Sequence, residues 1–116
     1  MEVQIFGSKK SSETRSALRF FAERRIKAHF VDFAVRGPAV GELTRFVQKF
    51  GINGILDTES RRFQELGWGS ARYSNETWLE RLSEEPMALR MPLVRWQQQL
   101  TVGAAEATWK TWKIGV

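Results

Sequence analysis

The residues from Glu2 to Phe33 read EVQIFGSKKSSETRSALRFFAERRIKAHFVDF and contain the clearest pattern of secondary structure in the chain. The first part of this stretch, Val3 to Phe6, is rich in β-forming side chains and is followed by Gly7, which predicts a strand and a turn. Ser11 or Ser12 then caps a helix that is expected to end near Arg25, because apolar residues recur at helical spacing. Side chains from Lys27 to Phe33 alternate between two faces, which predicts a second strand. A strand, a helix and a strand within about thirty residues predict a parallel pair joined by a crossover.

Helices are expected in the middle of the chain. Apolar residues on one face predict a helix from Val40 to Phe50, which Gly51 should end, and Ile52 to Asp57 is expected as a connector. A short helix is predicted over Ser60 to Leu66, and Gly67-Trp68-Gly69 should break the pattern. Ser74 or Asn75 is expected to cap a further helix, and Pro86 to start a helical turn that ends at Leu89.

The last part of the chain predicts a hairpin and a helix. Pro92 to Trp96 and Gln99 to Val102 are expected as its two strands, with a turn at Gln97-Gln98 that lacks the usual glycine or asparagine. Ala104 to Trp112 is predicted as the final helix, with Trp109 and Trp112 on its inner side.

Together these elements predict an α/β (α+β) fold. The expected architecture is a mixed four-stranded sheet flanked by helices, in the order β-α-β, a helical insert over about residues 40–90, and β-β-α. This arrangement is thioredoxin-like. The 116 residues fit a single domain, residues 1–116, which is long enough to bury a core without disulfides.

Composition excludes several kinds of chemistry. The chain has no cysteine and one histidine, His29, so thiolate nucleophiles, cysteine-ligated zinc and a histidine-rich metal site are not expected. No apolar run is long enough to span a bilayer and no signal-peptide pattern precedes the first strand, so we expect a cytoplasmic protein that does not bind membranes. The net charge of +5 weakly favours an anionic partner.

The start of the first predicted helix is the best candidate for a binding site. A helix N-terminus offers free N–H groups and the positive end of a dipole, to which Ser11 and Ser12 add hydroxyls and Lys10 and Arg15 add charge. These four residues are predicted to bind a phosphate, sulfate or carboxylate. The alternative is an ordinary capped helix with solvated cations.

Six short stretches then have the order and spacing of a known family: Ile5-Phe6-Gly7, Ala28 to Phe33, Gly41-Glu42-Leu43, Phe63 to Gly67, Pro92-Leu93-Val94 and Leu100 to Gly103. In these stretches the chain resembles the arsenate reductase (ArsC)-like family, which includes the Spx-type regulators and YffB-type proteins. The resemblance covers nearly the whole chain and implies a thioredoxin-like fold and a bacterial-type protein.

Departures from the family pattern bear on activity. The resemblance implies that the position of the catalytic cysteine falls on Ser11, with its supporting arginine matched by Arg15. The arginine before the family's cis-proline is replaced by Met91, which precedes Pro92, and the middle-loop arginine by Asp57 or a neighbour. A serine hydroxyl is a poor nucleophile without a base, so Ser11 is not expected to act as one.

Three hypotheses follow. The preferred one is a non-catalytic, cysteine-less member without a cofactor, acting as a binding or regulatory module, for which the family analogy suggests a protein partner such as RNA polymerase. The second is a reductase that takes its thiol from glutathione or a partner protein, with Ser11 as hydrogen-bond donor. The third is a basic nucleic-acid-binding module, based on the basic residues around the first helix, although no nucleic-acid motif accompanies them. A solvated basic face is the alternative to the third.

Overall fold

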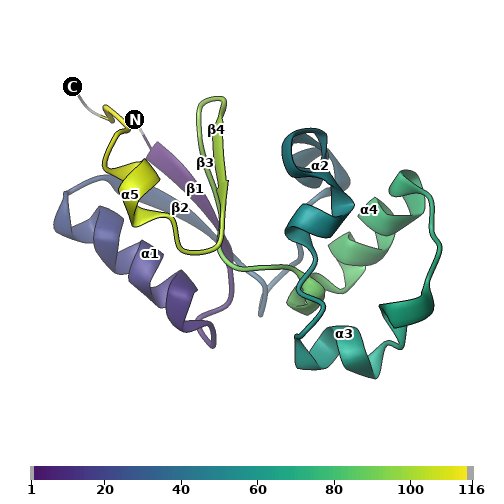
Figure 1. The fold of residues 1–116 in the computed structure, drawn as a ribbon. Coiled ribbons are helices and arrows are strands. Elements are labelled where there is room, and N and C mark those ends of the chain that lie inside the picture. Colours follow the sequence, from purple (N-terminus) through teal and green to yellow (C-terminus); the bar gives the residue numbers. More distant parts are fainter. Residues whose placement is uncertain (1, 115–116) are drawn as a thin grey trace. The chain divides into compact units, whose positions relative to one another are not determined.

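The computed structural model describes residues 2–114 of the chain (Figure 1). The chain divides into two units, one formed by Met1–Asp32 with Met91–Val116 and the other by Phe33–Arg90. Within the described residues, no helix is both long and apolar enough to cross a bilayer.

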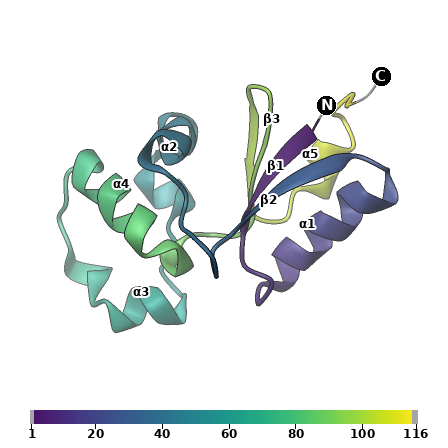
Figure 2. The same ribbon diagram turned by 180° about the vertical axis from the view of Figure 1, so that it is seen from behind.

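The first unit contains a four-stranded sheet in the order β2-β1-β3-β4 (Figure 1, Figure 2). The two N-terminal strands are parallel, while β1 with β3 and β3 with β4 are antiparallel. This confirms the predicted mixed sheet with an N-terminal crossover unit and a C-terminal hairpin. The bounds are β1 Glu2–Gly7, α1 Ser12–Glu23, β2 Lys27–Asp32, β3 Leu93–Trp96, β4 Gln99–Val102 and α5 Glu106–Trp109.

One face of this sheet packs against α1 and α5. Alternation along β1 directs Val3 and Ile5 to that face, since successive strand side chains point to opposite sides. The Trp109 indole lies among the rings of α1 and donates a buried 2.8 Å hydrogen bond to the Thr101 hydroxyl. The buried residues of this cluster are Val3, Ile5, Ala17, Phe20, Phe21, Val94 and Trp109.

The hairpin and the last helix differ in how closely they follow expectation. The strands β3 and β4 meet at Gln97-Gln98 as predicted, and Gln97 adopts a left-handed φ of 55° in place of the usual glycine or asparagine. The predicted helix over Ala104 to Trp112 was too long, because α5 spans only Glu106–Trp109. Beyond it the backbone tightens, with the N–H of Trp112 bonding to the carbonyl of Trp109, and Trp112 still packs on the cluster.

The second unit is helical, with α2 Val40–Ile55, α3 Arg61–Glu65, a 3₁₀ turn η1 Trp68–Ser70, α4 Asn75–Glu84 and a 3₁₀ turn η2 Pro86–Ala88. Gly51, with a φ of 74°, ends the helical geometry that begins at Val40, as predicted. The expected connector over Ile52 to Asp57 was wrong, because helical bonding resumes after Gly51 and Leu56 donates to the carbonyl of Ile52. Burial of Ile55 and Leu56 favours this second segment over the expected connector.

Caps and turns in the second unit agree with the sequence pattern. Ser60 caps α3 and Ser74 caps α4, each accepting a backbone N–H three residues ahead. Gly67 adopts the left-handed conformation at φ 67°, where the sequence predicted a break.

Candidate functional site

The loop between β1 and α1 is held tightly against the end of the strand. A Cβ atom on Gly7 would lie 2.5 Å from the hydroxyl oxygen of Thr14, so this position requires glycine. Thr14 is 0% exposed, in the first turn of α1. The packing of Thr14 on Gly7 therefore fixes where the N-terminus of α1 begins relative to β1.

Ser11 is the N-cap residue of α1. Its backbone is extended, and its hydroxyl oxygen accepts a 3.1 Å hydrogen bond from the N–H of Thr14. The loop before it closes on Ser8, whose carbonyl accepts from the N–H of Ser11 at 2.9 Å and whose hydroxyl accepts from the N–H of Lys10 at 3.2 Å. Of the two serines predicted as cap, Ser11 has this role.

Glu13 brings a carboxylate to the same helix end. The hydroxyl of Ser12 donates a 2.9 Å hydrogen bond to Glu13 Oε1. That bond lowers the pKa of Glu13, and its own backbone N–H, the Ser11 hydroxyl and the charge of Arg15 lower it further against the opposing effect of desolvation. An internal carboxylate thus already uses part of the positive potential at the N-terminus of α1. We did not predict this role, although the Ser-Ser-Glu sequence at a helix start is its signal.

The cations of the loop are positioned unequally. Arg15 Nη1 donates a 2.6 Å hydrogen bond to the carbonyl of Lys9, so this guanidinium closes over the loop backbone. The Lys9 ammonium lies 6.0 Å from the ring centre of Phe30. The Lys10 side chain is exposed and makes no hydrogen bond or ion pair with the residues described. Of the predicted anion-binding residues, Ser11, Ser12 and Arg15 therefore already make contacts within the chain.

Other basic residues of α1 also contact their own helix. Arg24 lies over the ring of Phe20, with its guanidinium carbon 3.6 Å from the ring centre, and donates to the Phe20 carbonyl. Arg19 donates a 3.3 Å hydrogen bond to the hydroxyl of Ser16. A nucleic-acid partner for this basic face stays a prediction.

The peptide bond between Met91 and Pro92 is cis. Pro92 is buried, and its carbonyl accepts a 2.8 Å hydrogen bond from the N–H of Gly103, which ties the start of β3 to the end of β4. Met91 is half-buried and apolar, so it brings no positive charge to this loop. The neighbouring Arg90 donates to the carbonyl of Leu56 in the second unit.

No histidine base lies beside Ser11. His29, the sole histidine, pairs in the sheet register with Gln4, near the start of β1, whereas Ser11 follows the other end of that strand. Three residues of extended chain separate Gln4 from Gly7, which amounts to about 10 Å. Among residues 2–114, no cluster of three or more histidine, aspartate or glutamate side chains is arranged to hold a metal ion.

A family comparison agrees with this architecture over most of the chain. A model described as ArsC family matches residues 6–112, which include the end of β1, the loop at Ser11, the Met91-Pro92 peptide and β4. The chain belongs to the ArsC family. Because the sequence contains no cysteine, it is a cysteine-less member. No curated protein matches the chain significantly.

Solved structures related to this ArsC-family chain share its thioredoxin-like fold. An ArsC family related protein from Bacteroides fragilis has a TM-score of 0.81 at 19% identity, covering 95% of this chain and 96% of that one. An arsenate reductase from Vibrio cholerae has a TM-score of 0.75 at 23% identity, covering 88% and 89%. An arsenate reductase (ArsC) related protein from Brucella melitensis has a TM-score of 0.67 at 21% identity, covering 97% and 94%. At these identities the likeness concerns the fold alone.

Proposed function

We propose that this ArsC-family chain is a non-catalytic binding or regulatory module of the cytoplasm. One hydrogen bond supports the proposal most directly. Ser11, which the family resemblance places at the nucleophile's position, uses its hydroxyl oxygen as the acceptor that caps α1. At this place the hydroxyl stabilises the fold, and the chain's single histidine, His29, does not lie beside it to make it a nucleophile.

The chemistry of thiol exchange supports the same conclusion. A thiolate is both a good nucleophile and a good leaving group, and a serine hydroxyl at neutral pH is neither. The resemblance implies that the arginine before the family's cis-proline is replaced by Met91. It also implies that the middle-loop arginine, which helps hold an oxyanion, is replaced by Asp57 or a neighbour, so charge complementarity to arsenate is reduced as well.

The N-terminus of α1 is the surface that we assign to an anionic group. This helix end is flanked in sequence by the predicted anion-binding residues Lys10, Ser11, Ser12 and Arg15, and a helix N-terminus offers N–H groups to an anion. Glu13 competes for the same donors, so a free small anion should bind weakly. A protein partner that brings an acidic side chain together with further contacts fits this surface better, and the family analogy suggests RNA polymerase.

The test is arsenate reduction with glutathione, measured for the wild type beside Ser11→Ala and Ser11→Cys variants. We expect no turnover by the wild type above that of the Ser11→Ala variant. Activity that appears only in the Ser11→Cys variant would show that the hydroxyl alone prevents catalysis. Turnover by the wild type that Ser11→Ala abolishes contradicts the proposal. Saturable binding of the purified chain to bacterial RNA polymerase would support the regulatory role, and its absence would remove that partner.

A second candidate is a reductase that takes its thiol from glutathione or a partner protein. One observation favours it. The Ser11 oxygen accepts from the Thr14 N–H, so its O–H can donate toward an incoming thiol sulfur, in competition with the Glu13 carboxylate. This candidate requires turnover that depends on both glutathione and Ser11, so the same assay decides between the two.

A further inference from the structure

The face of the sheet opposite α1 and α5 changes character along β1. Toward the carboxyl end of the strand, Phe6 pairs with Val31 of β2 and Leu93 of β3, and all three are buried. Two residues earlier, Gln4 occupies the same face, because side chains alternate along a strand. Its register partners are His29 and Arg95, so a row of three polar side chains crosses three strands.

This polar row lines a depression of about 310 Å³. Its lining is polar throughout and lies entirely within the first unit: Glu2, Gln4, His29, Arg95 and Gln97. A volume of this size holds a small molecule or a single charged group of a larger one.

Arg95 is held in a fixed orientation over the depression. Its Nε donates a 2.8 Å hydrogen bond to the carbonyl of Gln97, and its Nη1 lies 3.4 Å from the side-chain oxygen of Gln4. Arginine carries five N–H donors in a planar fork, so these contacts orient the group and leave donors for a ligand. No carboxylate of the described chain forms an ion pair with Arg95. A pre-oriented, unpaired guanidinium is suited to phosphate or carboxylate oxygens.

His29 and Glu2 complete the surroundings. His29 is exposed, lies two strand spacings from Arg95, about 10 Å away, and makes no hydrogen bond with the described residues. Its imidazole can supply an N–H donor from the far side of the depression. Glu2 Oε2 lies 4.0 Å from the ammonium of Lys27, which reduces the repulsion that this carboxylate exerts on an anion. The charged or titratable groups around the depression are therefore Glu2, Lys27, His29 and Arg95.

We propose that this depression binds the oxyanion group of a small molecule, a phosphate or a carboxylate, with Arg95 as its main ligand and His29 as a second donor. The site is separate from the N-terminus of α1 and does not depend on the proposed function. Arg95 provides charge and a forked pair of donors, and Gln4 and Gln97 keep that fork in place.

Nuclear magnetic resonance of the full ¹⁵N-labelled chain tests this assignment, with inorganic phosphate and acetate as separate probes. The backbone amides of Gln4, His29 and Gln97 and the Nε–H of Arg95 report on the depression, while those of Ser12 and Glu13 report on the N-terminus of α1. We expect saturable shifts at the first group with at least one probe. Shifts with phosphate alone would identify a phosphate site. Shifts with acetate alone would identify a carboxylate site, and shifts with both probes would show that the depression accepts either group.

Three variants make the test specific. Arg95→Gln should weaken binding of the probe about tenfold or more, and His29→Gln about two- to threefold. Lys110→Gln is the control, because it removes one positive charge from an exposed site elsewhere in the unit and should leave binding unchanged. Unchanged amide shifts away from the depression verify that each variant is folded. No saturable shift at the first group with either probe, or unaltered binding by a folded Arg95→Gln variant, overturns the assignment.

Discussion

The hydroxyl oxygen of Ser11 lies 3.1 Å from the backbone nitrogen of Thr14 and accepts its hydrogen bond at the start of α1. Thr14 is fully buried against Gly7, so this bond ties the N-cap to a part of the chain that cannot move independently of the sheet. The same serine that the family resemblance places at the nucleophile's position therefore has a structural role of its own. The first predictions separate the two roles.

Replacing Ser11 by alanine should destabilise the chain by about 1 kcal/mol, because α1 loses its N-cap acceptor. Urea denaturation followed by circular dichroism measures the change. Ser16→Ala is the matched control, since Ser16 lies within α1 and only accepts a surface bond from Arg19. Equal effects of the two substitutions would argue against the capping role.

A cysteine introduced by Ser11→Cys should have a thiol pKa below the ordinary value of about 8.5, because the Thr14 N–H and the helix dipole favour the thiolate. The Glu13 carboxylate opposes this effect, so adding Glu13→Gln should lower the thiol pKa further. The pH dependence of alkylation by iodoacetamide gives both values. An Ala22→Cys variant, near the other end of α1, should show no lowering; a lowered thiol pKa there as well would rule out a specific effect of the N-terminus.

Removing the carboxylate of Glu13 should strengthen anion binding at the N-terminus of α1. We expect the Glu13→Gln variant to bind inorganic phosphate about two- to fivefold more tightly than the wild type, as judged by the amide shifts of Ser12 and Glu13. The control is Glu23→Gln, which makes the same charge change at the opposite end of α1. Unchanged affinity in Glu13→Gln would mean that this carboxylate does not compete for the site.

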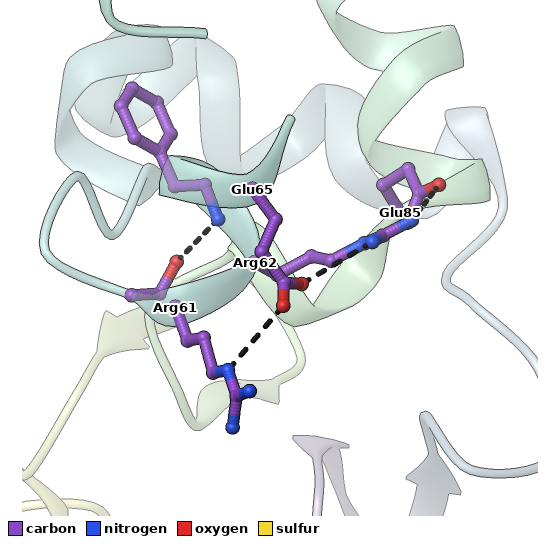
Figure 3. Close-up of polar contacts among 6 residues, drawn as sticks. Arg61, Arg62, Glu65 and Glu85 are labelled. Atoms are coloured by element: carbon purple, nitrogen blue, oxygen red, sulfur yellow. Dashed lines mark hydrogen bonds and ion pairs between the residues drawn. The ribbon is translucent and has the colours of Figure 1, made fainter. Parts of the chain in front are cut away.

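The second unit contains an ion-pair network centred on Arg62 (Figure 3). Its Nε and Nη2 each lie 2.8 Å from a different oxygen of Glu85, and Nη1 lies 3.4 Å from Glu65, which also contacts Arg61. The bonds to Arg62 lower the pKa of Glu85 below its ordinary value of 4.5. When folding lowers the pKa of a carboxyl group, its charged form stabilises the fold at any pH above the pKa of the unfolded state. This contribution is lost as the pH falls through the pKa of the folded state.

The Glu85→Gln variant should therefore unfold at a lower urea concentration than the wild type near neutral pH, and the difference should disappear at about pH 2. Both side chains of the pair are partly exposed, so the effect is small and weakens with added salt. Glu84→Gln, an exposed neighbour without a partner among the described residues, serves as the control. A difference between wild type and Glu85→Gln that persists in acid would count against the ion pair as its cause.

The bond between Trp109 and Thr101 should appear as coupling in a double-mutant cycle. Thr101→Val leaves the indole N–H of Trp109 buried without an acceptor, at a cost of about 1–3 kcal/mol. Trp109→Phe removes the donor and part of the packing on Phe20 and Phe21. The double variant should cost about 1 kcal/mol less than the sum of the single ones, measured by urea unfolding. Strict additivity would show that the bond contributes little.

Much of the fold follows from local pattern. Alternation in β1 and β2, the serine caps and the glycine turns set most elements to within one or two residues. The exceptions are α2, where a second helical segment follows Gly51 in place of the expected connector, and α5, which ends before Trp112. In both places burial of side chains decided the boundary, and burial depends on partners far along the chain.

Composition and local pattern are enough to show that this chain has no thiol, that Ser11 follows the turn at Gly7 and that a capped helix begins there, because these properties depend on neighbours within one helical turn. The row of His29, Gln4 and Arg95 is visible only in the folded chain, since Gln4 and Arg95 are 91 residues apart and meet through strand pairing. A shift of the strand register by one residue would turn these side chains to the opposite face. Alternation within a strand therefore determines on which face of the sheet a side chain lies, whereas the register between strands determines which side chains become its neighbours.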